Sequence, residues 1–203
     1  MKIVKVPQLI QYLFPSIIWK GKTDEKILHL TFDDSPTPEF TFWILNLLEK
    51  LNIKATFFCV GESTEKYPKI ILSILDKGHQ IGNHTYSHKN GFLSSTKSYL
   101  HNIERCKKIL PNTTLFRPPF GKIYPWQISK IKENYKIVMW DIVSYDFHKN
   151  ITEEKVKSNV LNNVENGSII VFHDNKKSKK ILKLCLEEIL QNLIKKGYRF
   201  KTI

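Results

Sequence analysis

The sequence of 203 residues predicts an α/β fold with a mainly parallel sheet, in the form of a compact or incomplete (β/α) barrel. Short, nearly continuous apolar runs alternate with stretches whose apolar residues recur at helical spacing, as expected for strands buried on both faces. Neither a repeat nor a linker divides the chain, so a single domain is expected. A doubly wound open sheet is the alternative, and both folds place function just past the C-terminal ends of the strands.

The apolar runs give the strands. The first run, ILHLTF, contains few polar residues, and the second, ATFFCV, contains one. The third run follows Gly78, a residue type that commonly ends helices. Strands are predicted at residues 27–32, 55–60, 80–83, 114–117, 137–140, 168–172 and 198–203.

The segments between these runs have helical patterns. Phe40, Ile44 and Leu47 fall on one face of the first of them. Pro125 suits the first turn of a helix, and Thr152 is a residue type that caps a helix N-terminus. Helices are predicted at residues 40–51, 67–77, 94–110, 125–134, from 152 onward, and 178–196.

The composition excludes several classes of protein. With 41% apolar and 12% aromatic residues the chain is not disordered, and three cysteines without a CxxC pair argue against a disulfide scaffold. The net charge is +13, but it comes from lysine, because only Arg105, Arg117 and Arg199 are arginines. Base-reading sites favour arginine, so no nucleic-acid partner is expected. The lysine excess fits biased composition, with some attraction to anionic surfaces as the alternative.

Residues 1–25 are predicted to form an amphipathic segment ahead of a catalytic domain at residues 26–203. The segment starts with positive charge, but Pro7 and Pro15 interrupt its apolar stretch and no small-residue cleavage site follows. It is expected to pack on the domain or to touch a membrane surface as a peripheral contact. With no clear signal peptide, a cytoplasmic or membrane-associated location is favoured over the cell envelope.

Polar residues stand at the ends of predicted strands. Asp33 and Asp34 follow the first strand, and two adjacent carboxylates there are costly unless a metal or hydrogen bonds hold them. Arg117 ends another strand before two prolines, and His173 directly follows the run IIVF. The alternative for each is a turn, a solvated surface residue or a satisfied core histidine.

His84 and His88 follow the third strand at a spacing of four residues. This spacing predicts that both lie on one face of a helical turn, where they can share a metal ion. Such a pair alone also arises by chance. Two histidines with one aspartate from another strand end form a ligand set of hydrolytic zinc sites.

Five segments in this order resemble the polysaccharide deacetylase family, also called the NodB-homology family or carbohydrate esterase family four. They are TFDDSP at 31–36, HTYSH at 84–88, RPPFG at 117–121, a Trp/Asp segment from 140, and IIVFHD at 169–174. The resemblance covers residues 26–203. It implies a distorted (β/α) barrel and removal of N-acetyl groups from amino sugars.

The resemblance also implies one divalent metal ion. Carried over by motif, its ligands are Asp34, His84 and His88. Zinc is the expected ion, and the ligand set also accommodates cobalt or nickel.

Catalytic roles carried over by motif fall to four further residues. Asp33 is the expected general base, oriented by Arg117. His173 is the expected general acid, and Asp146 tunes it and keeps its imidazolium charged. Amide hydrolysis needs such a base for water and such an acid for the leaving amine.

Substrate contacts are implied for Phe120, through its backbone N–H at the oxyanion, and for Phe147 and Val171, which line the acetyl pocket. The chain departs from the family pattern at Ser35, where Gly is usual, and at Val143, where Asp is usual. Phe147 replaces a usual Trp. These departures concern the pocket shape more than the catalytic groups.

The expected function is therefore metal-dependent N-deacetylation of N-acetylglucosamine-type units in peptidoglycan, a chitin-like chain or an exopolysaccharide. One alternative is a deacetylase or deformylase of a lipid-linked amino sugar at the membrane face. Another is a catalytically silent glycan-binding homologue. The expected partner is the N-acetylated glycan, and the sequence favours no particular oligomeric state.

Overall fold

The computed structural model describes residues 3–110 and 112–203, and they form a curled sheet of parallel strands surrounded by helices. The strands are β1 (Ile17–Ile18), β2 (Ile27–Ser35), β3 (Thr56–Cys59), β4 (Gln80–Asn83), β5 (Leu115–Phe116), β6 (Lys136–Val138), β7 (Ile142–Val143), β8 (Ile169–His173) and β9 (Arg199–Phe200). The α-helices are α1 (Gln8–Leu13), α2 (Phe40–Lys50), α3 (Gly61–Lys66), α4 (Pro68–Asp76), α5 (Thr96–Lys107), α6 (Pro125–Ile131), α7 (Glu153–Leu161) and α8 (Lys176–Lys195).

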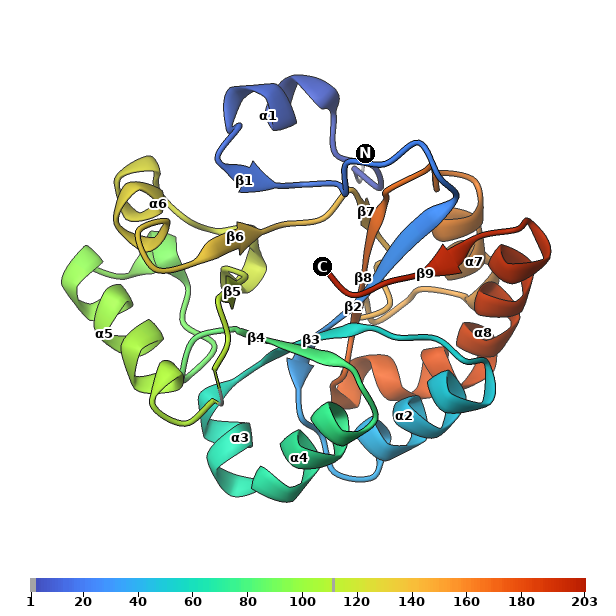
Figure 1. The fold of residues 1–203 in the computed structure, drawn as a ribbon, viewed down its shortest axis with the longest axis horizontal. Helices are drawn as coiled ribbons and strands as arrows, with labels where there is room; N and C mark the ends of the chain where they lie inside the picture. Colours follow the sequence, from blue (N-terminus) through green and yellow to red (C-terminus); the bar gives the residue numbers. More distant parts are fainter. Residues whose placement is uncertain (1–2, 111) are drawn as a thin grey trace.

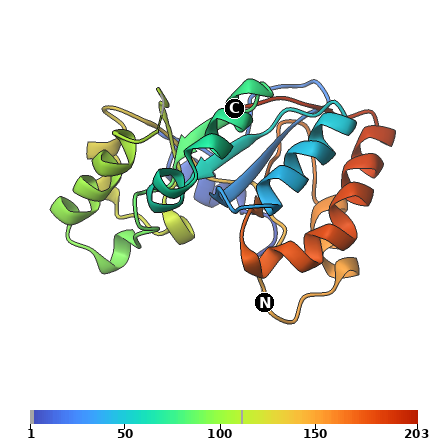
Figure 2. The ribbon, with the colours of Figure 1, turned by 90° about the horizontal axis from the view of Figure 1, so that it is seen from below.

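The sheet has the order β1-β6-β5-β4-β3-β2-β8-β7, and β9 pairs with β2. The strands converge around a centre, and α2 to α8 lie around the outside (Figure 1). Figure 2 shows α5 and α8 on opposite flanks of the sheet. This is the expected incomplete barrel, and the alternative of a doubly wound open sheet is wrong.

Four short elements have no counterpart in the sequence prediction: α1, β1, α3 and β7. β1 and β7 have only two residues each, which is too short to show periodicity, and α3 has the polar sequence GESTEK. The first strand extends to Ser35 instead of ending at residue 32, because Asp33 continues the parallel register opposite His173 of β8. The last strand is limited to two residues of the predicted range 198–203.

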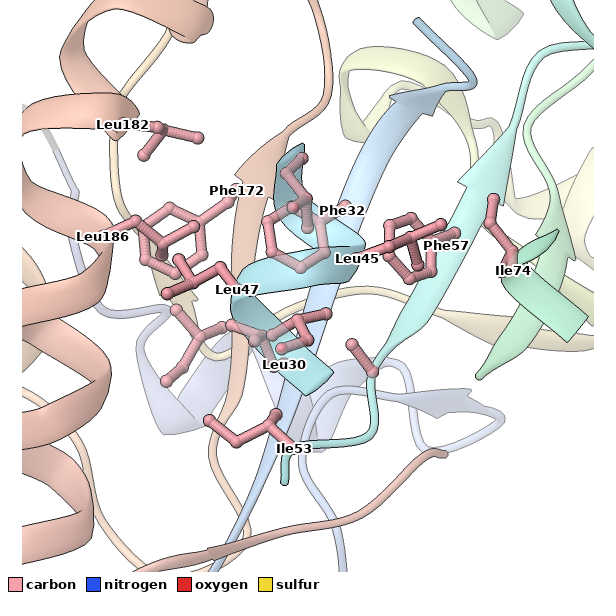
Figure 3. Packing of buried hydrophobic residues seen from close by; sticks show 14 of the residues in the cluster. Leu30, Phe32, Leu45, Leu47, Ile53, Phe57, Ile74, Phe172, Leu182 and Leu186 are labelled. Atoms are coloured by element: carbon pink, nitrogen blue, oxygen red, sulfur yellow. The ribbon is translucent and has the colours of Figure 1, made fainter. Parts of the chain in front are cut away.

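Alternation along β2 separates the core from the barrel interior. Leu30 and Phe32 point toward α2 and α8 in a cluster that includes Phe57 and Phe172 (Figure 3). The ring of Phe32 lies 5.1 Å from that of Phe57 and 6.0 Å from that of Phe172, measured between centroids. The intervening residues of β2 therefore face the interior, and Asp33 is one of them.

The N-terminal segment joins the two edges of this sheet. β1 pairs in parallel with β6, and Lys5 forms an antiparallel bridge to Ile142 of β7. Ile10 and Phe14 pack against buried residues of the domain. One of the two expectations for this segment, packing on the domain, is thus what the described residues show. No helix in the described part of the chain is long and apolar enough to cross a membrane.

His79 lies in the core with 5% of its surface exposed, and its Nδ1 accepts a hydrogen bond from the backbone N–H of Ala55. Burial lowers its pKa to about 4, so the folded protein holds it neutral while the unfolded chain protonates it near pH 6.5. The free energy of unfolding is therefore expected to fall as the pH drops from 6.5 to 4. One such group contributes at most about 1.4 kcal/mol per pH unit.

Urea unfolding at pH 7, 5.5 and 4.5 measures this effect. His79→Asn keeps an acceptor for the Ala55 N–H but does not titrate, so its stability should depend less on pH. The matched control is His101→Gln, because His101 is exposed on α5. Identical pH slopes in His79→Asn and the parent protein would contradict the prediction.

Candidate metal and catalytic site

The predicted functional residues meet in one pocket at the C-terminal ends of β2, β4, β5 and β8. Parallel strands place their carboxyl ends at the same edge of a sheet, so segments distant in sequence converge there. The pocket has a volume of about 290 Å³. It is lined by eight of the ten predicted site residues: Asp33, Asp34, His84, His88, Phe120, Phe147, Val171 and His173. The other two, Arg117 and Asp146, hydrogen-bond lining residues from behind the pocket wall.

Asp34, His84 and His88 bring three ligand atoms to within 4.8 Å of one another. Oδ1 of Asp34 lies 3.0 Å from Nε2 of His88 and 3.7 Å from Nε2 of His84. This oxygen is buried and has no hydrogen bond within the described residues. Burial opposes the charge of Asp34, yet the close approach of His88 and the nearby histidine rings hold its pKa below the usual range.

The ring of His84 is fixed in the form that binds metals. Its Nδ1 lies 2.8 Å from the backbone oxygen of Arg117, and a carbonyl only accepts, so Nδ1 carries the proton. Nε2 is then unprotonated, and its lone pair lies on the side of Asp34, whose Oδ1 is 3.7 Å away. Burial lowers the pKa of His84 to about 4, which keeps the ring neutral at physiological pH.

The segment that carries the two histidines is not helical, and the prediction of a helical turn was wrong. Thr85 and His88 have φ angles of 63° and 51°, outside the helical region. The side chain of Asn83 accepts from the N–H of Thr85 at 2.8 Å, and the hydroxyl of Thr85 accepts from the N–H of Lys89. These bonds shape a turn that brings the two imidazole centroids to 5.1 Å.

Asp33 is held by Arg117, whose side chain is fully buried. One guanidinium nitrogen donates to Oδ1 of Asp33 at 2.6 Å and to the hydroxyl of Thr31 at 2.8 Å. The remaining nitrogens donate to the backbone oxygens of Val138 and Met139. With all its nitrogens engaged the guanidinium has one orientation, and it fixes the carboxylate of Asp33.

His173 has the corresponding arrangement with Asp146. Its Nδ1 lies 2.8 Å from Oδ1 of Asp146, and its backbone N–H donates to Oδ2. Burial of the ring opposes its charge, but the charge and hydrogen bond of Asp146 raise the pKa of His173 to about 9. Asp141, the other aspartate of this segment, accepts from Ser168 instead.

The remaining predicted residues form the pocket walls. Phe120 has a φ of 62° and 59% of its surface exposed, and its ring lies 4.5 Å from that of His88. The ring of Phe147 lies 4.7 Å from that of His173. Val143 also lines the pocket, so two departures from the family pattern fall in its wall.

One residue beside the candidate ligands was not predicted from the sequence. Asn175 donates from Nδ2 to Oδ2 of Asp34 at 2.7 Å, while its Oδ1 caps α8 by accepting from two backbone N–H groups. Asp174 is fully buried, and burial raises its pKa to about 7. An asparagine before a helix is a recognisable cap, but the helix was predicted from residue 178 and Asn175 fell outside it.

Asn175→Ser is expected to weaken metal binding about 10- to 100-fold, because the donor that orients Asp34 is lost while a capping oxygen remains. Competition with a chelating dye measures the zinc or cobalt dissociation constant. Asn192→Ala is the matched control, since its amide donates to a backbone oxygen on the exposed side of the same helix. An unchanged dissociation constant for Asn175→Ser would count against a role for this amide.

Known proteins resemble the chain in sequence and in fold. Residues 20–140 match the polysaccharide deacetylase family. A peptidoglycan-N-acetylglucosamine deacetylase of Bacillus cereus is 36% identical over 192 residues, covering 91% of this chain and 70% of the relative. A second one from the same organism is 32% identical over 198 residues, covering 92% and 91%.

The fold similarity is equally extensive. The crystal structure of the Bc1960 peptidoglycan N-acetylglucosamine deacetylase superposes with a TM-score of 0.86 at 34% identity, covering 98% of this chain and 95% of that one. The sequence match covers more than half of the chain, and the motifs that carry it meet in one pocket. The chain therefore belongs to the polysaccharide deacetylase family, the NodB-homology or carbohydrate esterase family four.

Proposed function

We propose that the protein is a metal-dependent hydrolase that removes N-acetyl groups from N-acetylglucosamine-type units of peptidoglycan. One observation carries the proposal: the group Asp34, His84 and His88 shares a pocket with a carboxylate outside the group, Asp33, and with His173, whose pKa is raised to about 9. The similarity to peptidoglycan-N-acetylglucosamine deacetylases supports the choice of glycan.

The residues fit a divalent ion. Oδ1 of Asp34 is buried without a hydrogen bond in the described part of the chain, and the lone pair of His84 is directed at it. One carboxylate and two imidazoles suit zinc, and cobalt or nickel are accommodated by the same set. When bound, the ion supplies Lewis acidity for the amide carbonyl and lowers the pKa of a water molecule.

Asp33 is the proposed general base. Arg117 occupies its Oδ1, which leaves Oδ2 on the pocket side, 4.0 Å from Nε2 of His84. Because Asp33 is outside the ligand group, its carboxylate is available to take the proton of the attacking water. Arg117 acts through Asp33 and is a positioning residue.

His173 is the proposed general acid. Its Nδ1 is hydrogen-bonded to Asp146, so Nε2 is the ring nitrogen that can donate a proton into the pocket. With a pKa raised to about 9, the ring is protonated at neutral pH and can donate to the leaving amine nitrogen. Asp146 positions the ring and stabilises its charge.

The acyl group is proposed to sit against Val171 and Phe147, which line the pocket beside His173. The backbone N–H of Phe120 is the proposed donor to the developing oxyanion. A hydrogen bond that forms only as the charge develops lowers the barrier without tightening substrate binding.

Acetate release tests the proposal. The chelated protein is incubated with peptidoglycan, N-acetylglucosamine oligomers or an acetylated exopolysaccharide, before and after adding zinc, cobalt or nickel. Release from peptidoglycan that requires added metal is the expected result. Acetate release that is unaffected by chelation would contradict the proposed mechanism. The absence of acetate release from every glycan would contradict the proposed function.

Exposed apolar side chains on α1 favour a second candidate, a lipid-linked amino sugar as substrate at the membrane face. Leu9, Tyr12 and Leu13 have 68%, 82% and 62% of their surface exposed. Such a surface suits peripheral contact with a bilayer. Leu9→Ser with Leu13→Ser should then lose association with liposomes, and unchanged association would count against this candidate.

A further inference from the structure

Three aromatic rings lie against one another on the surface outside the catalytic pocket, two of them stacked and the third tilted. The centroid of Tyr124 lies 4.4 Å from that of Trp126, with an interplanar angle of 10°, and 4.6 Å from that of Phe92. Trp126 has 57% and Phe92 has 44% of its surface exposed. Soluble proteins seldom expose clustered large apolar side chains without a binding role. We call Phe92, Tyr124 and Trp126 the ring stack.

The ring stack lies a short length of chain away from the proposed metal centre. Two chain segments run from that centre, one from His88 to Phe92 and the other from Phe120 to Tyr124. At the near end the rings of His88 and Phe120 are 4.5 Å apart, and at the far end those of Phe92 and Tyr124 are 4.6 Å apart. Four residues of extended chain span at most about 14 Å. The ring stack is therefore within a few sugar units of the reacting amide.

A buried side chain holds the two segments together between these ends. Gln127 has no exposed surface; its Oε1 accepts from the backbone N–H of Tyr124 and its Nε2 donates to the backbone oxygen of Gly91. A side chain at Gly91 would collide with the backbone oxygen of Lys122, so the segments are in direct contact. Asn90 also accepts from the N–H of Phe92. The rings are thus held in place before any ligand arrives.

We propose that the ring stack is a glycan subsite, which binds a further pyranose unit of the chain whose amino sugar occupies the catalytic pocket. A pyranose ring presents an apolar face of C–H groups that packs on an exposed aromatic face, while its hydroxyl groups stay in water. A rigid platform binds such a unit with little loss of side-chain entropy. The proposal rests on the proposed function, because the catalytic pocket sets the position of the chain.

The test compares chain lengths. Binding of N-acetylglucosamine hexamer and dimer is measured by titration calorimetry on zinc-loaded protein carrying Asp33→Asn, so that the probe is not consumed. Adding Trp126→Ala should weaken hexamer binding about three- to tenfold. The dimer is expected to occupy the catalytic pocket without reaching the ring stack, and it should lose less than twofold. Trp126→Phe should recover most of the hexamer affinity because a flat ring is restored.

Leu93→Ala is the matched control. Leu93 is 84% exposed beside Phe92 but contributes no ring, so its removal should leave both affinities unchanged. Equal losses for hexamer and dimer, a loss in Leu93→Ala as large as in Trp126→Ala, or no binding of the hexamer would each overturn the proposal. Acetate release from peptidoglycan by the unmodified protein tests the catalytic function separately, so the two failures are distinguishable.

Discussion

Asp33→Asn is expected to lower the rate of acetate release about a thousandfold while the metal still binds. The amide oxygen of Asn can accept the hydrogen bond from Arg117, so the side chain keeps its place but cannot take a proton from water. Asp33 is outside the ligand group, and its loss leaves Asp34, His84 and His88 intact. Acetate release measures the rate, and metal analysis after dialysis measures the occupancy.

Folding must be followed in the same variant. Removing the charge of Asp33 leaves the buried guanidinium of Arg117 without its counter-charge, so some loss of stability is expected. A thermal midpoint above the assay temperature, together with retained metal, would show that the catalytic loss is local. The matched control is Asp76→Asn on the exposed end of α4, which should keep full activity. Rates within tenfold of the parent protein would exclude Asp33 as the base.

His84→Ala is expected to lose both metal and activity. Removing one of the three proposed ligands should weaken metal binding by more than about 100-fold, since even indirect supports of a ligand are worth 10- to 100-fold. Acetate release should fall by about three orders of magnitude, because Lewis-acid stabilisation is worth several kcal/mol. Dye competition and acetate release measure the two effects.

Two further variants distinguish the loss of a metal ligand from a general packing defect. His84→Asn places an amide where Nδ1 of His84 lies, so it can still donate to the backbone oxygen of Arg117, and it should be folded but metal-poor. His101→Ala removes an exposed histidine of α5 and should behave as the parent protein. Normal metal content in both His84 variants would remove His84 from the ligand group.

The sequence was most informative where side chains extend from regular strands. Asp33 and His173 could be placed together because parallel strands end at one edge, and the structure pairs these residues in register across β2 and β8. Arg117 could be associated with a carboxylate because a strand end and two prolines fix its backbone. For such residues, the periodicity of the strands and their common direction are enough to predict where the side chains lie.

Local conformations that depend on side-chain hydrogen bonds could not be predicted from periodicity and chain direction. The turn at His84 depends on Thr85 at positive φ, which is stabilised by Asn83 and by the contact with Lys89. Asn175 acts on Asp34 across 141 positions of sequence, so no local pattern indicates the contact. The ring stack likewise joins two segments more than thirty residues apart, and single aromatic residues within loops carry no periodic signal.

The N-terminal segment has a consequence for how the molecules behave toward one another. Through β1 it pairs with β6 on one side, and through Lys5 it bridges to β7 on the other, so it covers part of the backbone that β6 and β7 would otherwise expose. Exposed sheet edges are templates for strand pairing between chains. A chain without residues 3–19 would keep every proposed ligand and catalytic side chain, yet we expect it to aggregate more readily than the parent protein.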